Sequence, residues 1–233
     1  MYFIWILLYE IVTITSHKIS QIIGITYPIT TISMVIYVVT LLDWLKKENK
    51  THDVAFQKID LKQLNMCFYG IPLLALPLFN LITTENHTIS VLFWVWTLCV
   101  VTVEELFFRG FLYDLLAKWN KCGYVIISSL LFGIFHFINI LEGKDWIYVC
   151  MQVLCAFVVG ICYAALVVRW GSVFPCIFVH FLTNISAGKV SVMEEANSFT
   201  YEMSGLWCCI GIYAVYGLWL CKKENRRGWN FHA

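Results

Sequence analysis

The stretch VEELFFRGFLYDLL, Val103 to Leu116, places Glu104, Glu105 and Arg109 within six positions of one another in a segment otherwise suited to hydrocarbon. It follows SVLFWVWTLCVV, residues 90–101, a run without a single charge. On membrane-insertion scales, each ionisable group inside a spanning helix costs about 2.5–3.5 kcal/mol or more. Such groups persist there when they pair, line a water-filled cavity or take part in chemistry. These three residues therefore decide how the rest of the chain is interpreted.

The composition of the chain is typical of a membrane protein. Its 233 residues are 60% hydrophobic and 13% charged, whereas a soluble globule averages about 45–50% apolar and about 25% charged residues. The formal net charge of +1 excludes a strongly basic nucleic-acid-binding surface, so no nucleic-acid partner is expected. The cysteines lie mostly in apolar runs and show no C-x-x-C spacing, which favours a role as small hydrophobic side chains.

Eight apolar stretches follow one another, separated by short polar joints. A spanning helix needs about 20 residues. Most stretches are long enough, although the first is short and contains Glu10. We therefore predict an all-α polytopic helix bundle, a single transmembrane domain over residues 1–233 with about eight membrane helices and the active site inside the bundle; seven helices are the alternative. The stretches are approximately residues 2–15, 22–45, 66–83, 88–117, 123–141, 147–168, 171–188 and 203–221.

The distribution of lysine and arginine predicts the orientation of these helices. With the N-terminus inside, all of the 16 basic residues except Lys18, Lys144, Lys189 and the intrahelical Arg109 fall in inside joints or the tail. The positive-inside rule then places both termini in the cytoplasm. The polar joint at residues 46–63 is interpreted as a solvated cytoplasmic loop, with a lipid-headgroup-binding surface as the alternative.

The charged residues of the opening stretch differ in the partners they can reach. Glu105 and Arg109 are spaced i, i+4, so an ion pair on one helix face would offset much of their burial cost. Glu104 is rotated by about 100° from Glu105, so its partner must come from another helix. On these residues alone, a structural polar cluster that holds helices together remains an alternative.

Only two of the six histidines lie inside predicted helices, and each has a possible partner one turn away. Phe132 and His136 in LFGIFHFIN are spaced i, i+4, and so are His180 and Asn184 in FVHFLTN. A carboxylate and an imidazole can share a water and take its proton as a general base. A second imidazole and an amide can donate hydrogen bonds to a developing oxyanion. These groups together suit hydrolysis of an acyl bond by water.

The motifs resemble those of the CPBP family, the CAAX-protease and bacteriocin-processing intramembrane endopeptidases, also called the Abi family. In chain order, E-E-x-x-x-R, F-x-x-x-H and H-x-x-x-N lie at Glu104, Glu105 and Arg109, at Phe132 and His136, and at His180 and Asn184. EELFFRG is similar to the family's EE-x-x-F-R-G, and YAALVVRWGSVFPCIFVHFLTN resembles the stretch that leads into its last motif. The resemblance covers about residues 100–188, which would form the catalytic core.

The resemblance implies four catalytic residues. Glu104 and His136 would activate the attacking water, and His180 and Asn184 would stabilise the oxyanion. A zinc ion on Glu104, His136 and His180 is the alternative, because two histidines and a carboxylate form a known catalytic zinc set. Catalytic zinc ligands are commonly close in sequence, as in H-E-x-x-H, and zinc-bound histidines usually have a carboxylate partner rather than an amide. We therefore expect metal-independent hydrolysis with Glu104 as the base.

The resemblance also implies supporting residues and a class of substrate. Glu105 and Arg109 would hold the glutamate-bearing helix in place, and Phe132 would shape the pocket around His136. Family members cleave CAAX tripeptides from prenylated proteins, process peptide pheromones or bacteriocins, or confer bacteriocin immunity. The expected partners are membrane lipids and a membrane-associated, prenylated or leader-type peptide. The short length of the chain and the absence of a large insertion and of an organelle signal favour a bacterial cell membrane as the location.

Two other functions compete with a peptidase. One is a non-catalytic bacteriocin-immunity or scaffold protein of the same fold. The other is a proton-coupled transporter in which the Glu, His and Arg side chains form a proton relay. Transporters often show paired repeats with broken helices in corresponding positions, and the sequence shows no such symmetry.

Overall fold

The computed structural model describes residues 2–48, 50, 69–83, 90–141, 143–190 and 195–226. Within these ranges the regular elements are helices, and no strand occurs. The prediction of an all-α bundle is therefore confirmed. Most of the polar joint predicted at residues 46–63 lies outside the described residues.

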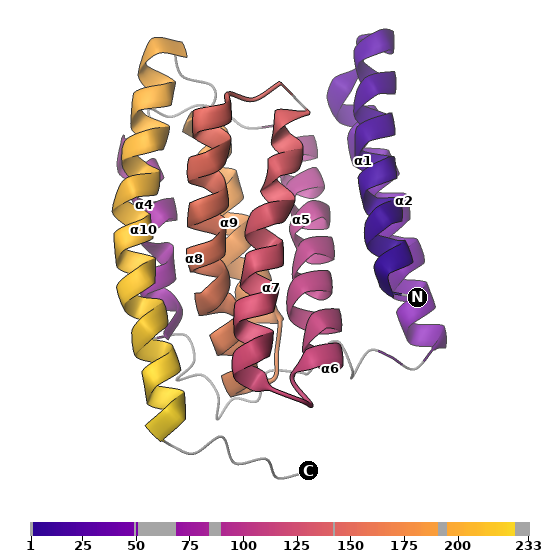
Figure 1. Cartoon of the computed structure of the whole chain (residues 1–233). Helices are drawn as coiled ribbons and strands as arrows, with labels where there is room; N and C mark the ends of the chain where they lie inside the picture. The colour runs from indigo at the N-terminus through magenta and orange to yellow at the C-terminus, as the bar shows by residue number, and fades with distance from the viewer. Residues whose placement is uncertain are drawn as a thin grey trace.

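Among the described residues, eight helical segments cross the bundle in the order expected from the apolar stretches. They run alternately up and down, so α1 begins and α10 ends toward the same end of the bundle (Figure 1). The elements are α1 (Tyr2–Ile23), α2 (Thr26–Lys47), η2 (Ile71–Leu74) with α4 (Ala75–Thr83), α5 (Val91–Glu105) with η3 (Leu106–Phe111) and α6 (Leu112–Leu116), α7 (Lys121–Phe135) with η4 (His136–Ile140), α8 (Trp146–Trp170), α9 (Phe174–Val190) and α10 (Glu195–Arg226).

The lengths of the helices depart from the sequence expectation at α1 in particular. It has 22 residues and continues to Ile23, beyond the apolar run that was expected to end near residue 15. Among the described residues, five helical spans are long and apolar enough to cross a membrane, and two apolar helices are shorter. The five are Tyr27–Lys47, Val91–Leu116, Lys121–Ile140, Trp146–Trp170 and Met203–Lys222.

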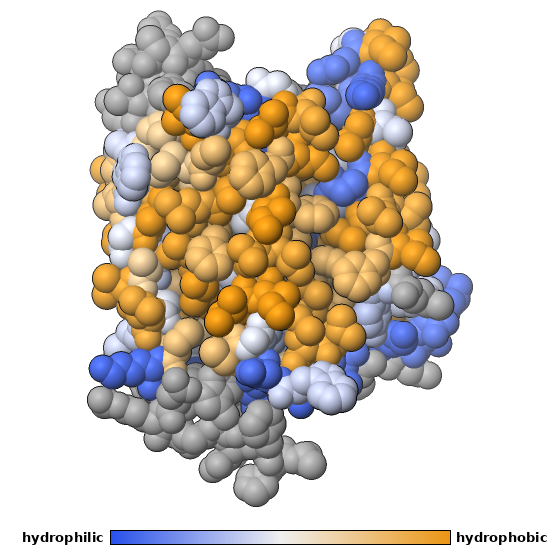
Figure 2. Space-filling view, viewed as in Figure 1, coloured by the Kyte–Doolittle hydropathy of each residue, from blue (hydrophilic) through white to orange (hydrophobic). Residues whose placement is uncertain are grey.

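The outer surface matches a membrane environment. Hydrophobic side chains cover the middle of the face seen in Figure 2, and hydrophilic ones gather toward its two ends. On α1, Phe3, Ile4 and Leu7 each expose more than half of their surface, which is costly in water but expected against lipid tails. Together with the five spans, this surface identifies an integral membrane protein.

Several helices begin or end at residues suited to that position. The Ser90 hydroxyl accepts a hydrogen bond from the Leu92 amide at the start of α5, and the Asn120 side chain accepts from the Gly123 amide at the start of α7. Such caps satisfy amides that the helix leaves unpaired. At the other end of α8, Gly171 has φ 67°, a left-handed conformation that glycine adopts without steric cost.

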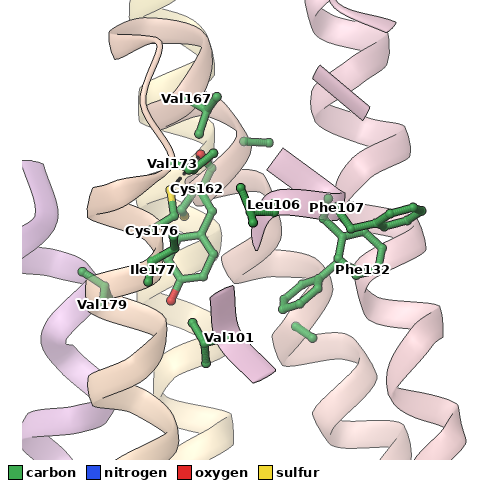
Figure 3. Close-up of a cluster of buried hydrophobic side chains, with 14 of the residues drawn as sticks. Val101, Leu106, Phe107, Phe132, Cys162, Val167, Val173, Cys176, Ile177 and Val179 are labelled. Carbon is green, nitrogen blue, oxygen red and sulfur yellow. Dashed lines mark hydrogen bonds between the residues drawn. The ribbon is translucent and has the colours of Figure 1, made fainter. Parts of the chain in front are cut away.

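Small residues let α7 and α8 approach each other closely. A Cβ atom on Gly133 would lie 2.9 Å from the Val153 carbonyl oxygen, and one on Gly160 would lie 3.1 Å from the Ser129 Cα. Membrane helices use such residues because close backbone packing replaces the missing hydrophobic drive for association. The core beside them is apolar and includes the buried thiols of Cys162 and Cys176 (Figure 3).

Candidate active site

The helix that carries the two glutamates changes its winding directly after them. Residues Leu106–Phe111 form a π-helical segment, and all six are buried. A π turn leaves carbonyls without their usual partners and is frequent at functional sites. Here Ser128 on α7 donates to the Phe108 carbonyl at 2.6 Å, and Tyr124 donates to the Arg109 carbonyl at 3.4 Å. The sequence pattern predicted one regular helix over this region, so the π segment corrects that expectation.

The predicted ion pair between Glu105 and Arg109 is present. Arg109 Nε lies 3.3 Å from Glu105 Oε2, and both side chains are fully buried. The guanidinium carbon lies 4.0 Å from the centre of the Phe132 ring and 5.3 Å from that of Tyr163. The guanidinium nitrogens have no hydrogen-bond acceptor among the described residues. The cation is thus held by the Glu105 charge and by the faces of aromatic rings.

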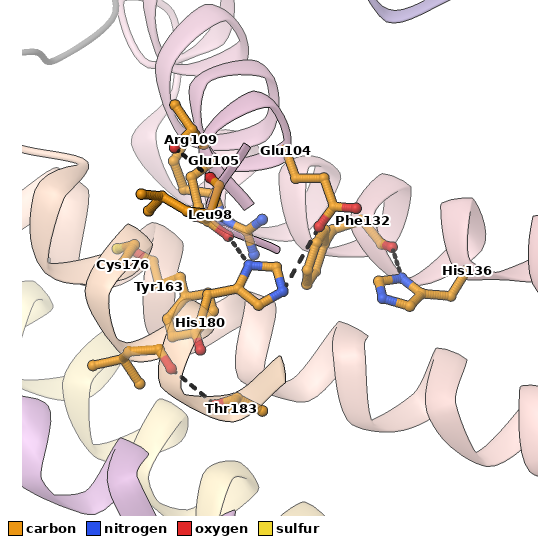
Figure 4. A network of polar contacts seen from close by, with 12 residues as sticks. Leu98, Glu104, Glu105, Arg109, Phe132, His136, Tyr163, Cys176, His180 and Thr183 are labelled. Atoms are coloured by element: carbon orange, nitrogen blue, oxygen red, sulfur yellow. Dashed lines mark hydrogen bonds and ion pairs between the residues drawn. The ribbon is translucent and has the colours of Figure 1, made fainter. Parts of the chain in front are cut away.

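His180 on α9 lies between the two glutamates. Its Nδ1 is 2.9 Å from Glu105 Oε1, and its Nε2 is 3.7 Å from Glu104 Oε2 (Figure 4). Because a carboxylate accepts hydrogen bonds, Nδ1 is the donor to Glu105, and Nε2 faces Glu104. Arg109, Glu105 and His180 therefore form a chain of contacts in which each residue fixes the next.

Glu104 finds its partners on other helices, as expected from its position on the helix face. The Tyr9 hydroxyl on α1 donates to Glu104 Oε1 at 3.2 Å, and His180 on α9 faces the other carboxylate oxygen. Each oxygen of Glu104 thus has a neighbour from a different helix. This carboxylate is held at the meeting point of α1, α5 and α9.

His136 lies where α7 passes into η4. Its Nδ1 is 2.8 Å from the Phe132 carbonyl oxygen, which can only accept, so Nδ1 carries the proton. In the neutral ring, Nε2 then carries the lone pair. The Phe132 ring meets His136 edge-on at 4.9 Å between centroids and His180 at 5.6 Å. Phe132 therefore separates the two imidazoles and sets their orientation, as Figure 4 shows.

A cavity of about 310 Å³ is lined by three of the four predicted catalytic residues. Glu104, His136 and Asn184 line it, although 80 positions separate the first from the last. His180 is not part of the lining, but its Nε2 lies 3.7 Å from Glu104 Oε2. The three residues come from α5, from η4 at the end of α7, and from α9, and Tyr9 on α1 lines the cavity as well. Asn139 and Gln152, joined by a 2.7 Å hydrogen bond, add an amide pair to the wall.

The residues proposed as zinc ligands are not arranged as a three-ligand site. Within the described ranges, no group of three His, Cys, Asp or Glu side chains is placed to hold a metal ion. His180 turns its two nitrogens toward Glu105 and Glu104, and His136 lies across the Phe132 ring. The described residues therefore offer no three-ligand geometry for the zinc alternative.

Sequence reasoning missed two features of the site. Tyr9 contacts Glu104 across 95 positions, and nothing in the apolar pattern of α1 distinguishes it from a lipid-facing aromatic residue. Tyr163 places its ring beside both Arg109 and His180. The sequence reveals contacts only between residues four apart on one helix. Neither tyrosine is four residues from a motif residue, so neither could be found in this way.

The chain was compared with protein-family models, and part of it matches. Residues 86–186 match the family described as Rce1-like, type II CAAX prenyl endopeptidase Rce1-like. This range extends from just before α5 into α9 and contains all seven motif residues. No curated protein and no solved structure matches the chain. The resemblance seen in the motifs is thereby confirmed, since residues 86–186 are similar to the Rce1-like family of CAAX-type proteases.

Proposed function

We propose that the protein is an intramembrane endopeptidase that hydrolyses a peptide bond of a membrane-associated or lipidated protein or peptide. The observation that carries this proposal is the shared cavity, in which Glu104, His136 and Asn184 face one space and His180 lies 3.7 Å from Glu104. The match of residues 86–186 to a protease family supports the reaction class. Charged groups so deeply buried in a membrane bundle are costly, which supports a chemical role for them.

Glu104 and His136 activate the attacking water in this mechanism. The Glu104 carboxylate takes a proton from a water molecule, and the Nε2 lone pair of His136 orients that water by accepting its other hydrogen. The water oxygen forms a bond to the scissile carbonyl carbon while the carbonyl electron pair moves to its oxygen. Glu104 then gives the proton to the leaving amine as the C–N bond breaks, so a free acid and a free amine result. Such general-base catalysis contributes about 10²–10⁴-fold.

His180 and Asn184 stabilise the oxyanion that forms during the attack. In this role, His180 Nε2 carries a proton, while Nδ1 donates to Glu105 at 2.9 Å. Asn184 lies one turn further along α9 and lines the cavity, whereas His180 lies beside the cavity, next to Glu104. The Glu105–Arg109 pair keeps His180 in place, so the donor is oriented before the substrate binds. Preorganised donors of this kind stabilise a transition state without rearranging during the reaction.

The surroundings of the cavity favour a peptide that reaches it from the membrane. Phe108, Phe132 and Phe135 contribute apolar surface beside the charged groups, and apolar walls strengthen electrostatic interactions by excluding water. We expect a membrane-associated, prenylated or leader-type peptide as the substrate, with lipids as the neighbours. A bacterial cell membrane and cytoplasmic termini are the proposed location and orientation, the latter from the basic residues.

The experiment that tests the proposal compares purified wild-type protein with the Glu104→Gln variant in proteoliposomes. Quenched fluorescent peptides with and without a prenylated cysteine serve as substrates. Peptidomics of cell membranes that contain either protein identifies the peptides released from endogenous substrates. We expect hydrolysis by the wild type and a loss of at least about 10²-fold in the variant, the scale of a general base. The Glu48→Gln variant, which alters an exposed carboxylate at the end of α2, should keep wild-type activity.

Other outcomes would point to the competing functions. If the wild type releases no peptide but protects cells against a bacteriocin, and Glu104→Gln protects equally well, the protein is an immunity protein and the hydrolytic proposal is wrong. Proton flux into the proteoliposomes that depends on Glu104, without peptide release, would indicate a transporter instead.

A further inference from the structure

Helix α1 reaches the proposed base from outside the segment that matches the family model. The Tyr9 hydroxyl donates to Glu104 Oε1 at 3.2 Å, and the tyrosine is 5% exposed while it also lines the cavity. We propose that Tyr9 is a positioning residue for the hydrolysis. Its hydroxyl fixes the Glu104 carboxylate so that one oxygen faces the water, and α1 thereby completes the active site. This inference rests on the function proposed above.

The position of α1 is set by contacts that do not involve the Tyr9 hydroxyl. Tyr2 stacks on Phe111 with 4.3 Å between ring centres, and Phe3 meets Phe107 edge-on at 6.0 Å. Both partners lie in the π-helical segment after the glutamates. Partner numbers fall as residue numbers rise along α1, so α1 runs antiparallel to the helix that carries Glu104. The contact between Tyr9 and Glu104 continues this antiparallel series of contacts between the two helices.

Aromatic packing also holds the ring of Tyr9. Its centre lies 6.1 Å from that of Tyr37 on α2, and the Tyr37 hydroxyl in turn donates to the Trp5 carbonyl on α1. The α1–α2 hairpin is therefore tied together beside the tyrosine. Removing the Tyr9 hydroxyl leaves these ring contacts in place, so the role of the hydroxyl can be separated from the role of the ring.

The Tyr9 hydroxyl makes a shorter polar contact with the Glu104 carboxylate than His180 does. The charged or titratable groups near Glu104 include His180 from α9, Glu105 on the same helix and Arg109 from η3. His136, Glu10 and Lys144 line the same cavity. Of these, His180 faces Oε2 at 3.7 Å, beyond hydrogen-bond distance. Tyr9 therefore provides the shorter contact and determines which oxygen points to the water. Misplacement of a catalytic group by about 1 Å can cost about 10²-fold in rate.

The test measures kcat, KM and the thermal midpoint of Tyr9→Phe in the proteoliposome assay. We expect kcat to fall by about 10–100-fold, because Glu104 loses its orientation, while KM and Tm stay near the wild-type values. Tyr37→Phe is the matched control. It removes a neighbouring tyrosine hydroxyl that also binds α1, but at the Trp5 carbonyl. It should lower Tm and leave kcat unchanged.

A double-variant comparison tests whether the effect passes through Glu104. In Glu104→Asp the shortened carboxylate withdraws from the Tyr9 hydroxyl, so adding Tyr9→Phe should reduce kcat by less than about threefold, a non-additive result. Additive losses of kcat in the double variant would overturn the positioning role. So would a Tyr9→Phe protein with a lowered Tm but wild-type kcat per folded molecule. An inactive wild type would instead refute the hydrolytic function itself, so the two failures are distinguishable.

Discussion

Replacement of Arg109 by alanine is the perturbation with the most direct structural consequence. The change removes a fully buried cation that lies 3.3 Å from Glu105 and 4.0 Å from the centre of the Phe132 ring. The Glu105 carboxylate, also fully buried, then keeps its contact with His180 Nδ1 at 2.9 Å but has lost its cationic partner. The site loses the first member of the contact chain that orients His180.

The expected cost follows from the burial of both partners. Removing one member of a buried ion pair destabilises a protein by about 3–5 kcal/mol, because it leaves an uncompensated charge in a low-dielectric interior. Loss of the contact with Phe132 adds to this, since a desolvated cation–π interaction contributes up to about 2 kcal/mol. We therefore expect Arg109→Ala to unfold at a clearly lower temperature and to lose activity as well.

The assay is thermal unfolding in detergent micelles together with kcat in proteoliposomes. Lys47→Ala is the matched control, because Lys47 and Asp43 at the end of α2 form another i, i+4 pair, at 2.6 Å, with side chains that are 73% and 55% exposed. An exposed pair contributes about 0–1 kcal/mol, so this variant should resemble the wild type. The double variant Glu105→Gln, Arg109→Ala should recover part of the lost stability. An Arg109→Ala protein with wild-type Tm and full activity would refute the reasoning.

Three further predictions concern other parts of the site. Asn184→Ala should reduce kcat by about 10²–10³-fold with little change in KM, as removal of an oxyanion donor does; a raised KM with unchanged kcat would place Asn184 in substrate binding. Gly160→Ala should lower both Tm and kcat, because its Cβ would lie 3.2 Å from Arg109 Nη2, whereas Gly211→Ala, with open space around the added atom, should change neither. Activity should survive exhaustive treatment with a strong chelator if Glu104 is the base, and a loss restored stoichiometrically by zinc would show that metal is required.

The sequence by itself determined the membrane class, the order of the helices and the residues worth examining. Apolar runs near 20 residues require helices in lipid, because each backbone group must find its partner within the segment. The Glu105–Arg109 pair was predictable for a similar reason, since residues four apart share a helix face. The same local geometry showed that Glu104 needs a partner from elsewhere.

Only the tertiary structure decided which partner that is. The contacts of Glu104 with Tyr9 and His180, and the separation of the two imidazoles by Phe132, depend on how each helix is rotated and how closely it approaches its neighbours. That approach is set by packing at positions such as Gly160, far along the chain from the glutamates. The π-helical turn depends likewise on another helix, because the hydroxyls of Ser128 and Tyr124 on α7 donate hydrogen bonds to its carbonyls. Helix periodicity fixes neighbours within one helix, whereas contacts between helices arise only when the whole bundle has packed.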